Sequence, residues 1–183
     1  MLETLKTLCE LNGTSGREED VGAYILERIE GKCEIKVDAL GNIIAFKEGK
    51  KRAKNKVMIS AHMDEVGFII TYITDDGYLR FDCVGGIDEK VIVGRAVTVG
   101  EQNVPGVIGI KAIHLTDKAE EGKVPEISTM YIDIGAADKK EAEKYVSIGD
   151  SAYFISDFEF FGENKVKSKA LDDRFGCSVM IDM

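Results

Sequence analysis

The sequence predicts an α/β domain that is interrupted by a small inserted β domain. Helix-like and strand-like segments alternate over residues 1–66, and short strand-like runs separated by turn residues fill residues 67–162. An apolar, helix-like segment returns within residues 163–183. We therefore expect the first and last ranges to form two parts of one α/β domain, with a small barrel or sandwich inserted between them.

Two helices are expected at the start of the chain. The first is marked by apolar residues at helical spacing, Leu2, Leu5, Leu8 and Cys9. It should end at Asn12 and Gly13, which favour a break. Ser15 and Glu18 have the spacing of a capping box, which predicts a second helix that ends near Gly31. The buried face of the second helix should consist of Val21, Ile25 and Ile29.

Strand-like segments follow at residues 34–37 and 42–46. After a lysine-rich connection, the apolar run Val57–Ser60 predicts a buried strand that ends at Ala61. Open α/β sheets place their sites at the carboxyl ends of their strands. His62 is therefore expected at the functional edge of a central sheet.

A histidine and an aspartate lie two positions apart directly after this run. In an extended chain, residues i and i+2 point to the same side. Asp64 can therefore accept a hydrogen bond from one ring nitrogen of His62 and fix its tautomer, which leaves the other nitrogen to bind a metal ion. The alternative is a solvated, locally hydrogen-bonded histidine, which is the more frequent outcome for a histidine at a strand end.

Two adjacent acids precede the apolar segment near the end of the chain. Asp172 and Asp173 repel each other unless a cation or hydrogen bonds compensate their charges, and Arg174 follows directly. One interpretation is that a carboxylate of this pair binds a cation. The other is that one of the two acids caps a helix that begins at Arg174.

The inserted domain should consist mainly of short strands. They are expected at residues 68–74, 78–83, 91–99, 104–110 and 130–134. A turn at residues 75–77 joins the first two, and Asp138 is expected to cap a short helix over residues 139–145. His114, the other histidine of the chain, lies in this domain and is interpreted as a hydrogen-bonded structural residue rather than a ligand. Residues 158–161 then lead back to the α/β domain.

Composition excludes several classes of function. The 24 Lys and Arg residues against 33 Asp and Glu residues give a net charge of −9, which argues against nucleic-acid and anionic-membrane partners. No apolar stretch approaches the roughly 18 residues that a membrane-spanning helix needs, and no secretory signal opens the chain, so a cytoplasmic protein is expected. The four cysteines are widely spaced, which favours buried reduced thiols over a disulfide framework or a thiolate zinc site.

Five segments of the chain resemble segments of one protein family, and they occur in the same order as in that family. They are Ser15–Glu18, Asp38–Asn42, Ala61–Gly67, Pro105–Gly109 with Lys111 and His114, and Ala170–Arg174. The chain resembles the dinuclear-metal glutamyl and tetrahedral aminopeptidases, some members of which are labelled endoglucanases. The resemblance implies that His62 binds one metal ion, that Asp172 bridges two ions, and that Asp64 orients His62. Asp173 would be structural.

The same resemblance implies further properties of the protein. The α/β part would have a phosphorylase/hydrolase-like sheet, and the insert would be a PDZ-like barrel that pairs subunits into a homo-oligomer. The cofactors would be two divalent ions, zinc or cobalt, the substrate would be a peptide, and the peptide bond between Asp172 and Asp173 would be cis. In this family two adjacent glutamates, an aspartate and a final histidine complete the site beyond the part that this chain matches. We therefore expect this chain alone to bind metal weakly and to be inactive.

Two other functions are compatible with parts of the sequence. The chain could serve as a non-catalytic self-association module through its β insert. It could also belong to an endoglucanase-type glycan hydrolase, which requires two carboxylic acids on either side of the glycosidic bond. Adjacent Asp172 and Asp173 fit that arrangement poorly, so the aminopeptidase is the preferred function.

Overall fold

The computed structural model describes residues 1–51, 54–111 and 124–183. The described chain is mixed α/β and divides into two compact units, residues 1–65 with 157–183, and residues 66–156. Each unit has its own core of buried side chains. His114 and most of the Lys- and Glu-rich sequence that follows it lie outside the described residues.

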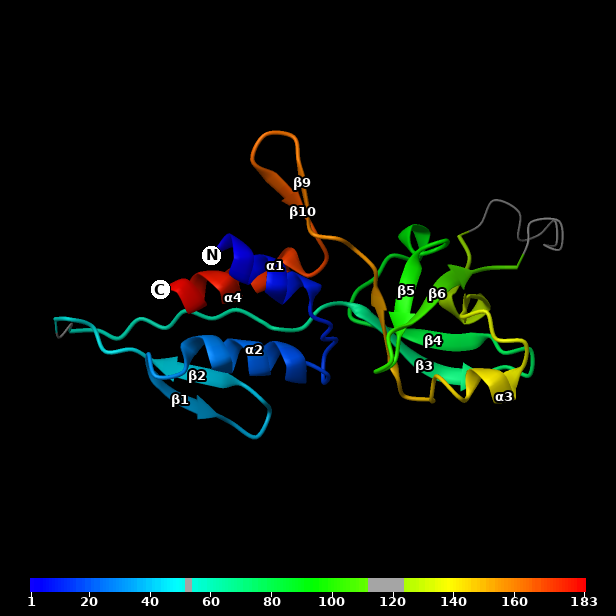
Figure 1. Cartoon of the computed structure of the whole chain (residues 1–183), viewed down its shortest axis with the longest axis horizontal. Helices are drawn as coiled ribbons and strands as arrows, with labels where there is room; N and C mark the ends of the chain where they lie inside the picture. Colours follow the sequence, from blue (N-terminus) through cyan, green and yellow to red (C-terminus); the bar gives the residue numbers. More distant parts are fainter. Residues whose placement is uncertain (52–53, 112–123) are drawn as a thin grey trace. The chain divides into compact units, whose positions relative to one another are not determined.

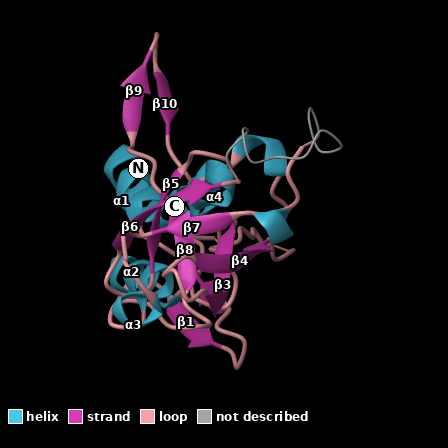
Figure 2. Cartoon of the chain, turned by 90° about the vertical axis from the view of Figure 1, so that its right-hand side faces the viewer, coloured by secondary structure: helices cyan, strands magenta, loops and turns pink. Residues whose placement is uncertain are grey.

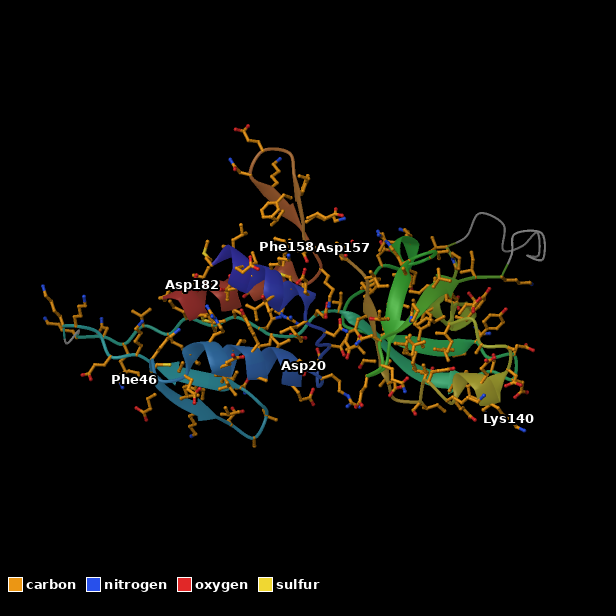
Figure 3. The ribbon with its side chains drawn as sticks, viewed as in Figure 1. Asp20, Phe46, Lys140, Asp157, Phe158 and Asp182 are labelled. Atoms are coloured by element: carbon orange, nitrogen blue, oxygen red, sulfur yellow. The ribbon has the colours of Figure 1, made fainter. Side chains whose placement is uncertain are left out.

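Three helices build the first unit. They are α1 (Leu2–Glu10), α2 (Glu19–Ile29) and α4 (Leu171–Asp182). Figure 1 shows α1 and α4 side by side, with both chain ends marked there. The amine of Met1 forms an ion pair with the carboxylate of Asp182, which is labelled in Figure 3. Leu8, Val21 and Cys177, one from each helix, form the buried centre of this unit. The predicted stripe of α1 is buried except at Leu2.

The predicted capping box at the start of α2 is wrong. Ser15 lies in a turn that is closed by a 2.8 Å hydrogen bond from the amide of Arg17 to the carbonyl of Thr14. This turn separates Ser15 from the first helical residue, and the N-cap residue Glu18 makes no side-chain cap hydrogen bond. The predicted inner face of the helix is correct, because Val21 and Ile29 are buried and Ile25 packs on the same cluster.

Two small antiparallel hairpins complete the first unit. Strands β1 (Glu34–Val37) and β2 (Ile43–Phe46) pair from Glu34 opposite Phe46 to Val37 opposite Ile43. The carboxylate of Asp38 accepts hydrogen bonds from the amides of Leu40 and Asn42, which fixes the turn between them. Strands β9 (Glu159–Phe161) and β10 (Lys165–Lys167) form the second hairpin.

The buried strand predicted over Val57–Ala61 is absent from the structure. This segment is extended in Figure 1, but none of the described residues pairs with it as a strand. Val57 and Met58 are 86% and 91% exposed. An apolar run becomes a buried strand only when neighbouring strands satisfy its backbone groups and other side chains cover its faces. The sequence pattern shows that the run is apolar, but it does not show whether neighbouring strands and covering side chains are present.

The second unit is a closed six-stranded barrel. Its strands are β3 (Gly67–Ile73), β4 (Leu79–Val84), β5 (Ala96–Val99), β6 (Val104–Gly109), β7 (Tyr131–Asp133) and β8 (Ser151–Phe154). They pair in the order β3-β4-β7-β6-β5-β8, and Figure 2 shows these strands in magenta. Closure leaves no free edge in the sheet. The inner side chains include Phe68, whose ring makes edge contacts with Phe81 and Phe154 at centroid distances of 4.9 and 5.0 Å.

Short elements connect the strands of the barrel. They are the 3₁₀ turns η1 (Glu89–Val91) and η3 (Ile127–Thr129) and the helix α3 (Lys139–Ala142). Asp138 caps α3 by accepting from the amide of Glu141 at 2.9 Å, as predicted, although the helix is shorter than expected. Gly77 in the predicted hairpin turn has φ +82°, and a Cβ there would lie 2.7 Å from the carbonyl oxygen of Ala136. None of the helices in the described ranges has the length and apolar character of a membrane span.

Candidate metal centre

His62 lies between two carboxylates within the first unit. Its Nδ1 is 3.0 Å from Oδ1 of Asp64, and its Nε2 is 3.1 Å from Oδ1 of Asp172. The contact with Asp64 is the one that the spacing of the two residues predicts for an extended chain. The structure therefore brings together all three residues that the sequence singles out, and their roles as ligands and orienting group remain predictions.

The start of α4 gives the two adjacent aspartates different environments. Asp172 and Asp173 form a kink within α4 because their φ and ψ are non-helical, so the regular part of the helix begins at Arg174. Oδ1 of Asp173 accepts a 3.0 Å hydrogen bond from the amide of Gly176, which is the contact of an N-cap residue. Asp172 precedes this cap in a non-helical conformation, and its side chain is 96% exposed. The peptide bond between the two is cis, as the resemblance implies. The cap interpretation is confirmed for Asp173. Cation binding by Asp172 remains a prediction.

The pKa values of His62 and Asp64 move apart. Burial would lower the pKa of His62, but its hydrogen bond to Asp172 and its interactions with Asp64 outweigh burial and raise the pKa above its usual value. Burial would raise the pKa of Asp64, but the hydrogen bond from Ser15 and the nearby imidazole lower it. Both pKa shifts favour an ionised Asp64 carboxylate that accepts a hydrogen bond from the ring of His62.

Ser15 has a role that the sequence does not reveal. Its hydroxyl donates to Oδ2 of Asp64, so both oxygens of this carboxylate face donors, the other being Nδ1 of His62. Ser15 contacts the carboxylate rather than the imidazole, and the three residues therefore do not form a Ser-His-Asp triad. Because 49 residues separate Ser15 from Asp64, no local pattern links them.

A buried ion pair lies next to Asp64 in the chain. The Nζ atom of Lys169 donates to Oε1 of Glu65 at 2.6 Å, to Oδ1 of Asn12 at 2.9 Å and to the carbonyl of Leu11 at 3.1 Å. The same Glu65 oxygen accepts from the amide of Gly13 at 3.1 Å. Burial lowers the pKa of Lys169, and the charge of Glu65 opposes this shift. The pair ties the loop after His62 to the end of α1.

Arg174 joins the same segments from the α4 side. Its side chain is fully buried, which is exceptional for a guanidinium, and it donates to the carbonyl oxygens of Met63 and Leu8. A Cβ at Gly13 would lie 2.9 Å from its Nη2 atom, so only glycine leaves room for the guanidinium there. The sequence pattern predicts only that Arg174 starts a helix, and it gives no indication of this contact. The only related feature of the sequence is a charged residue adjoining an apolar, helix-like segment.

The donor types of this site suit a metal ion, but their number does not complete a coordination sphere. Imidazole nitrogen and carboxylate oxygen are ligands of zinc and cobalt. A zinc site needs at least three protein ligands, and no group of three His, Cys, Asp or Glu side chains gathers around one point in the described ranges. The described residues therefore do not complete a metal site by themselves.

Comparison with known proteins identifies the family. A relative from Acetivibrio thermocellus named "Putative aminopeptidase" is 44% identical over 183 residues, which are 99% of this chain and 52% of the relative. The solved TET1 peptidase of Pyrococcus horikoshii, described as assembling into a tetrahedron or a large octahedral shell, matches with TM-score 0.85 and 40% identity over 99% of this chain and 54% of that chain. A Thermotoga maritima structure named endoglucanase matches with TM-score 0.81 and 41% identity over 97% and 52% of the two chains.

Each of these matches covers nearly all of this chain and about half of the matched protein. The chain spans about half the length of the curated relatives it matches. Residues 41–183, which include His62, Asp64 and Asp172, match the M42 glutamyl aminopeptidase family. The chain therefore belongs to the M42 glutamyl aminopeptidase family.

Proposed function

We propose that the protein acts as a metal-dependent aminopeptidase and that this chain contributes His62 and Asp172 to a centre of two divalent ions, zinc or cobalt. The main support is the 3.1 Å approach of His62 Nε2 to Asp172 Oδ1. When Nδ1 carries its proton toward Asp64, Nε2 presents a lone pair, so two acceptors face each other. Such a pair is stable only with a proton or a cation between the two atoms.

Each residue of the site has a distinct part in this proposal. His62 would hold one ion through Nε2, and Asp172 would hold both ions, because its exposed carboxylate has two oxygens to offer. Asp64 holds the imidazole, and Asp173 caps α4. The chemistry that such a centre supplies is activation of a water molecule and polarisation of the scissile carbonyl. The substrate is a peptide with a free amino terminus, in keeping with the names of the relatives.

The partners of the protein are part of the same proposal. We assign the second unit, residues 66–156, to the PDZ-like inserted domain that the sequence predicts over residues 67–162, and the remaining residues to a phosphorylase/hydrolase-like catalytic domain. The inserted domain would pair subunits into a homo-oligomer. The support is the similarity to a TET1 peptidase that is described as assembling into closed shells. Self-association through this barrel without any chemistry is the alternative. It predicts an oligomer that hydrolyses no peptide in any context.

The name of the Thermotoga maritima structure raises glycan hydrolysis as a second candidate. That reaction requires two carboxyl groups on either side of the scissile bond, one of them free to donate a proton. Next to Asp172, the carboxylate of Asp173 accepts from the amide of Gly176, and both oxygens of Asp64 face His62 and Ser15. Because the carboxylates of Asp64 and Asp173 already accept hydrogen bonds, neither is free to donate a proton to a glycosidic bond. The peptidase is therefore the preferred function.

A chimera tests the proposed function. This chain would be followed by the part of the Pyrococcus horikoshii TET1 peptidase that it does not cover, and assayed with zinc or cobalt. The substrates are aminoacyl anilides with free amino groups, and their N-acetylated forms are the control. We expect hydrolysis of the free forms only, abolished by His62→Ala or Asp172→Ala and retained by Asp76→Ala, which removes an exposed acid of the barrel.

Two results would overturn the proposal. One is a folded, metal-loaded chimera that cleaves oligosaccharides and leaves the anilides intact. The other is anilide hydrolysis that survives His62→Ala. The chain without the added part should show no turnover, because the described residues supply only two of the donors.

A further inference from the structure

The carboxylate of Asp64 is held from two sides. Its Oδ1 atom faces Nδ1 of His62 at 3.0 Å, and its Oδ2 atom accepts the hydroxyl proton of Ser15. A carboxylate with a single hydrogen-bonded partner can rotate away from it. Contacts at both oxygens select one orientation, the one in which Oδ1 receives the ring proton of His62.

The segment that carries Ser15 is fixed to the same loop by its backbone. The amide of Glu65 donates to the carbonyl of Gly13 at 2.8 Å, and Thr14 forms a parallel β-bridge with Glu65. The amide of Arg17 closes the turn around Ser15 by donating to the carbonyl of Thr14 at 2.8 Å. Thr14 and Glu65, which form the bridge, are the chain neighbours of Ser15 and Asp64. The backbone on both sides is therefore fixed next to the hydrogen bond between Ser15 and Asp64.

Two carboxylates compete for the proton of the neutral imidazole. Asp64 attracts it to Nδ1, and Asp172 attracts it to Nε2. The side chain of Asp172 is 96% exposed and that of Asp64 is 35% exposed, so water weakens the pull of Asp172 more strongly. Whether the imidazole proton resides on Nδ1 or on Nε2 then depends on how well Asp64 is oriented.

We propose that Ser15 is a positioning residue that holds Asp64 in the orientation that keeps the proton of His62 on Nδ1 and the lone pair of Nε2 free. Its effect on the imidazole stands on the contacts of this chain, whereas its importance for catalysis rests on the function proposed above. Ser15 neither caps α2 nor contacts the imidazole, so this is the role that its observed contact allows.

The test is the tautomer of His62, measured from the ¹⁵N chemical shifts of its ring in the metal-free chain above the midpoint of its own titration. We expect Nδ1–H to dominate in the wild type and in Ser15→Thr, and Nε2–H to become the major form in Ser15→Ala. Asp64→Asn is the positive control. Ser128→Ala is the matched control, because the Ser128 hydroxyl also donates to a carboxylate, that of Glu126 at 3.3 Å, in the other unit.

An unchanged tautomer in Ser15→Ala, with Asp64→Asn changed, would overturn the proposal. An equal change in Ser128→Ala would do the same. If Ser15→Ala does not fold, Ser15→Cys, which keeps the size but weakens the donor, replaces it with the same expected direction. The measurement needs neither metal nor substrate, so failure of the aminopeptidase function in the chimera would not affect it. In a metal-binding chimera, Ser15→Ala should also weaken metal affinity by about tenfold.

Discussion

The Nε2 atom of His62 lies 3.1 Å from Oδ1 of Asp172, although 110 residues separate the two in the sequence. The approach depends on the start of α4, where Asp173 takes the helix cap and Asp172 is left outside the helical conformation. It also depends on Arg174, whose side chain reaches from α4 to the carbonyl of Met63 beside His62. A structural aspartate and a buried arginine thus place the carboxylate next to the imidazole.

The two aspartates should respond differently to substitution. Asp173→Ala removes the cap of α4 and should lower the free energy of unfolding by about 1 kcal/mol. Asp172→Ala removes an exposed carboxylate and should change it by less than about 0.5 kcal/mol. Urea denaturation of both variants checks this. Equal losses of stability would contradict the assignment of the cap to Asp173 alone.

The buried pair of Lys169 and Glu65 should be important for stability. The side chains are 10% and 4% exposed, so replacing one partner leaves an uncompensated charge in the interior. Lys169→Met is expected to cost about 3 kcal/mol of unfolding free energy. The double variant Lys169→Met with Glu65→Leu should be less destabilised than the sum of the single variants. Additive losses in a double-mutant cycle would show that the two charges do not interact.

Gly176 should tolerate no side chain. A Cβ there would lie 2.6 Å from Oδ1 of Asp173 and 2.9 Å from Cβ of Ala61, so Gly176→Ala displaces the cap and the segment before His62. We expect a loss of about 1–3 kcal/mol. Gly22→Ala in α2 is the control, since its nearest contact is Cδ1 of Ile43 at 3.9 Å. This control should be stabilised by roughly 0.5–1 kcal/mol through helix propensity. Thermal unfolding of both variants distinguishes the two sites.

The thiol of Cys9 should react slowly even in alkaline solution. Burial raises its pKa from 9.0 to about 11, with smaller opposing effects of Arg174 and Lys169. Since the folded-state pKa is above that of the unfolded chain, this thiol contributes stability below pH 9 that is lost as the pH rises toward 11. Alkylation followed by peptide mapping should label the half-buried Cys33 well before Cys9. Early labelling of Cys9 at pH 9 would mean that α1 is not packed as observed.

Local patterns predicted much of the fold. The periodicity of α1 and α2, the β1 strand at residues 34–37 and the cap of α3 by Asp138 follow from the sequence, because each depends on residues a few positions apart. Strands β3, β4, β6 and β7 lie close to their predicted positions, whereas the strand predicted over residues 91–99 is formed only at Ala96–Val99 and begins after the 3₁₀ turn η1. Barrel closure, which pairs β3 with β8 some 80 residues later, was only one of two architectures that the pattern allowed.

The site was predicted in part. The contact of His62 with Asp64 follows from i, i+2 geometry, and the placement of Asp172 was expected only from the family resemblance. The contacts of Ser15, Lys169 and Arg174 were missed, since each joins segments at least 49 residues apart. The segment before His62 was wrongly predicted to be a buried strand, because apolar composition does not reveal whether partner strands are present.

The claim that His62 and Asp172 together bind a divalent cation is tested most directly by adding Co²⁺ to the ¹⁵N-labelled chain. Paramagnetic broadening should start at His62 and at residues around Asp172. It should be lost in His62→Ala and in Asp172→Ala, and kept in Asp173→Asn, which retains an oxygen to cap α4. Broadening that begins elsewhere, or that persists without the imidazole of His62, would contradict the claim.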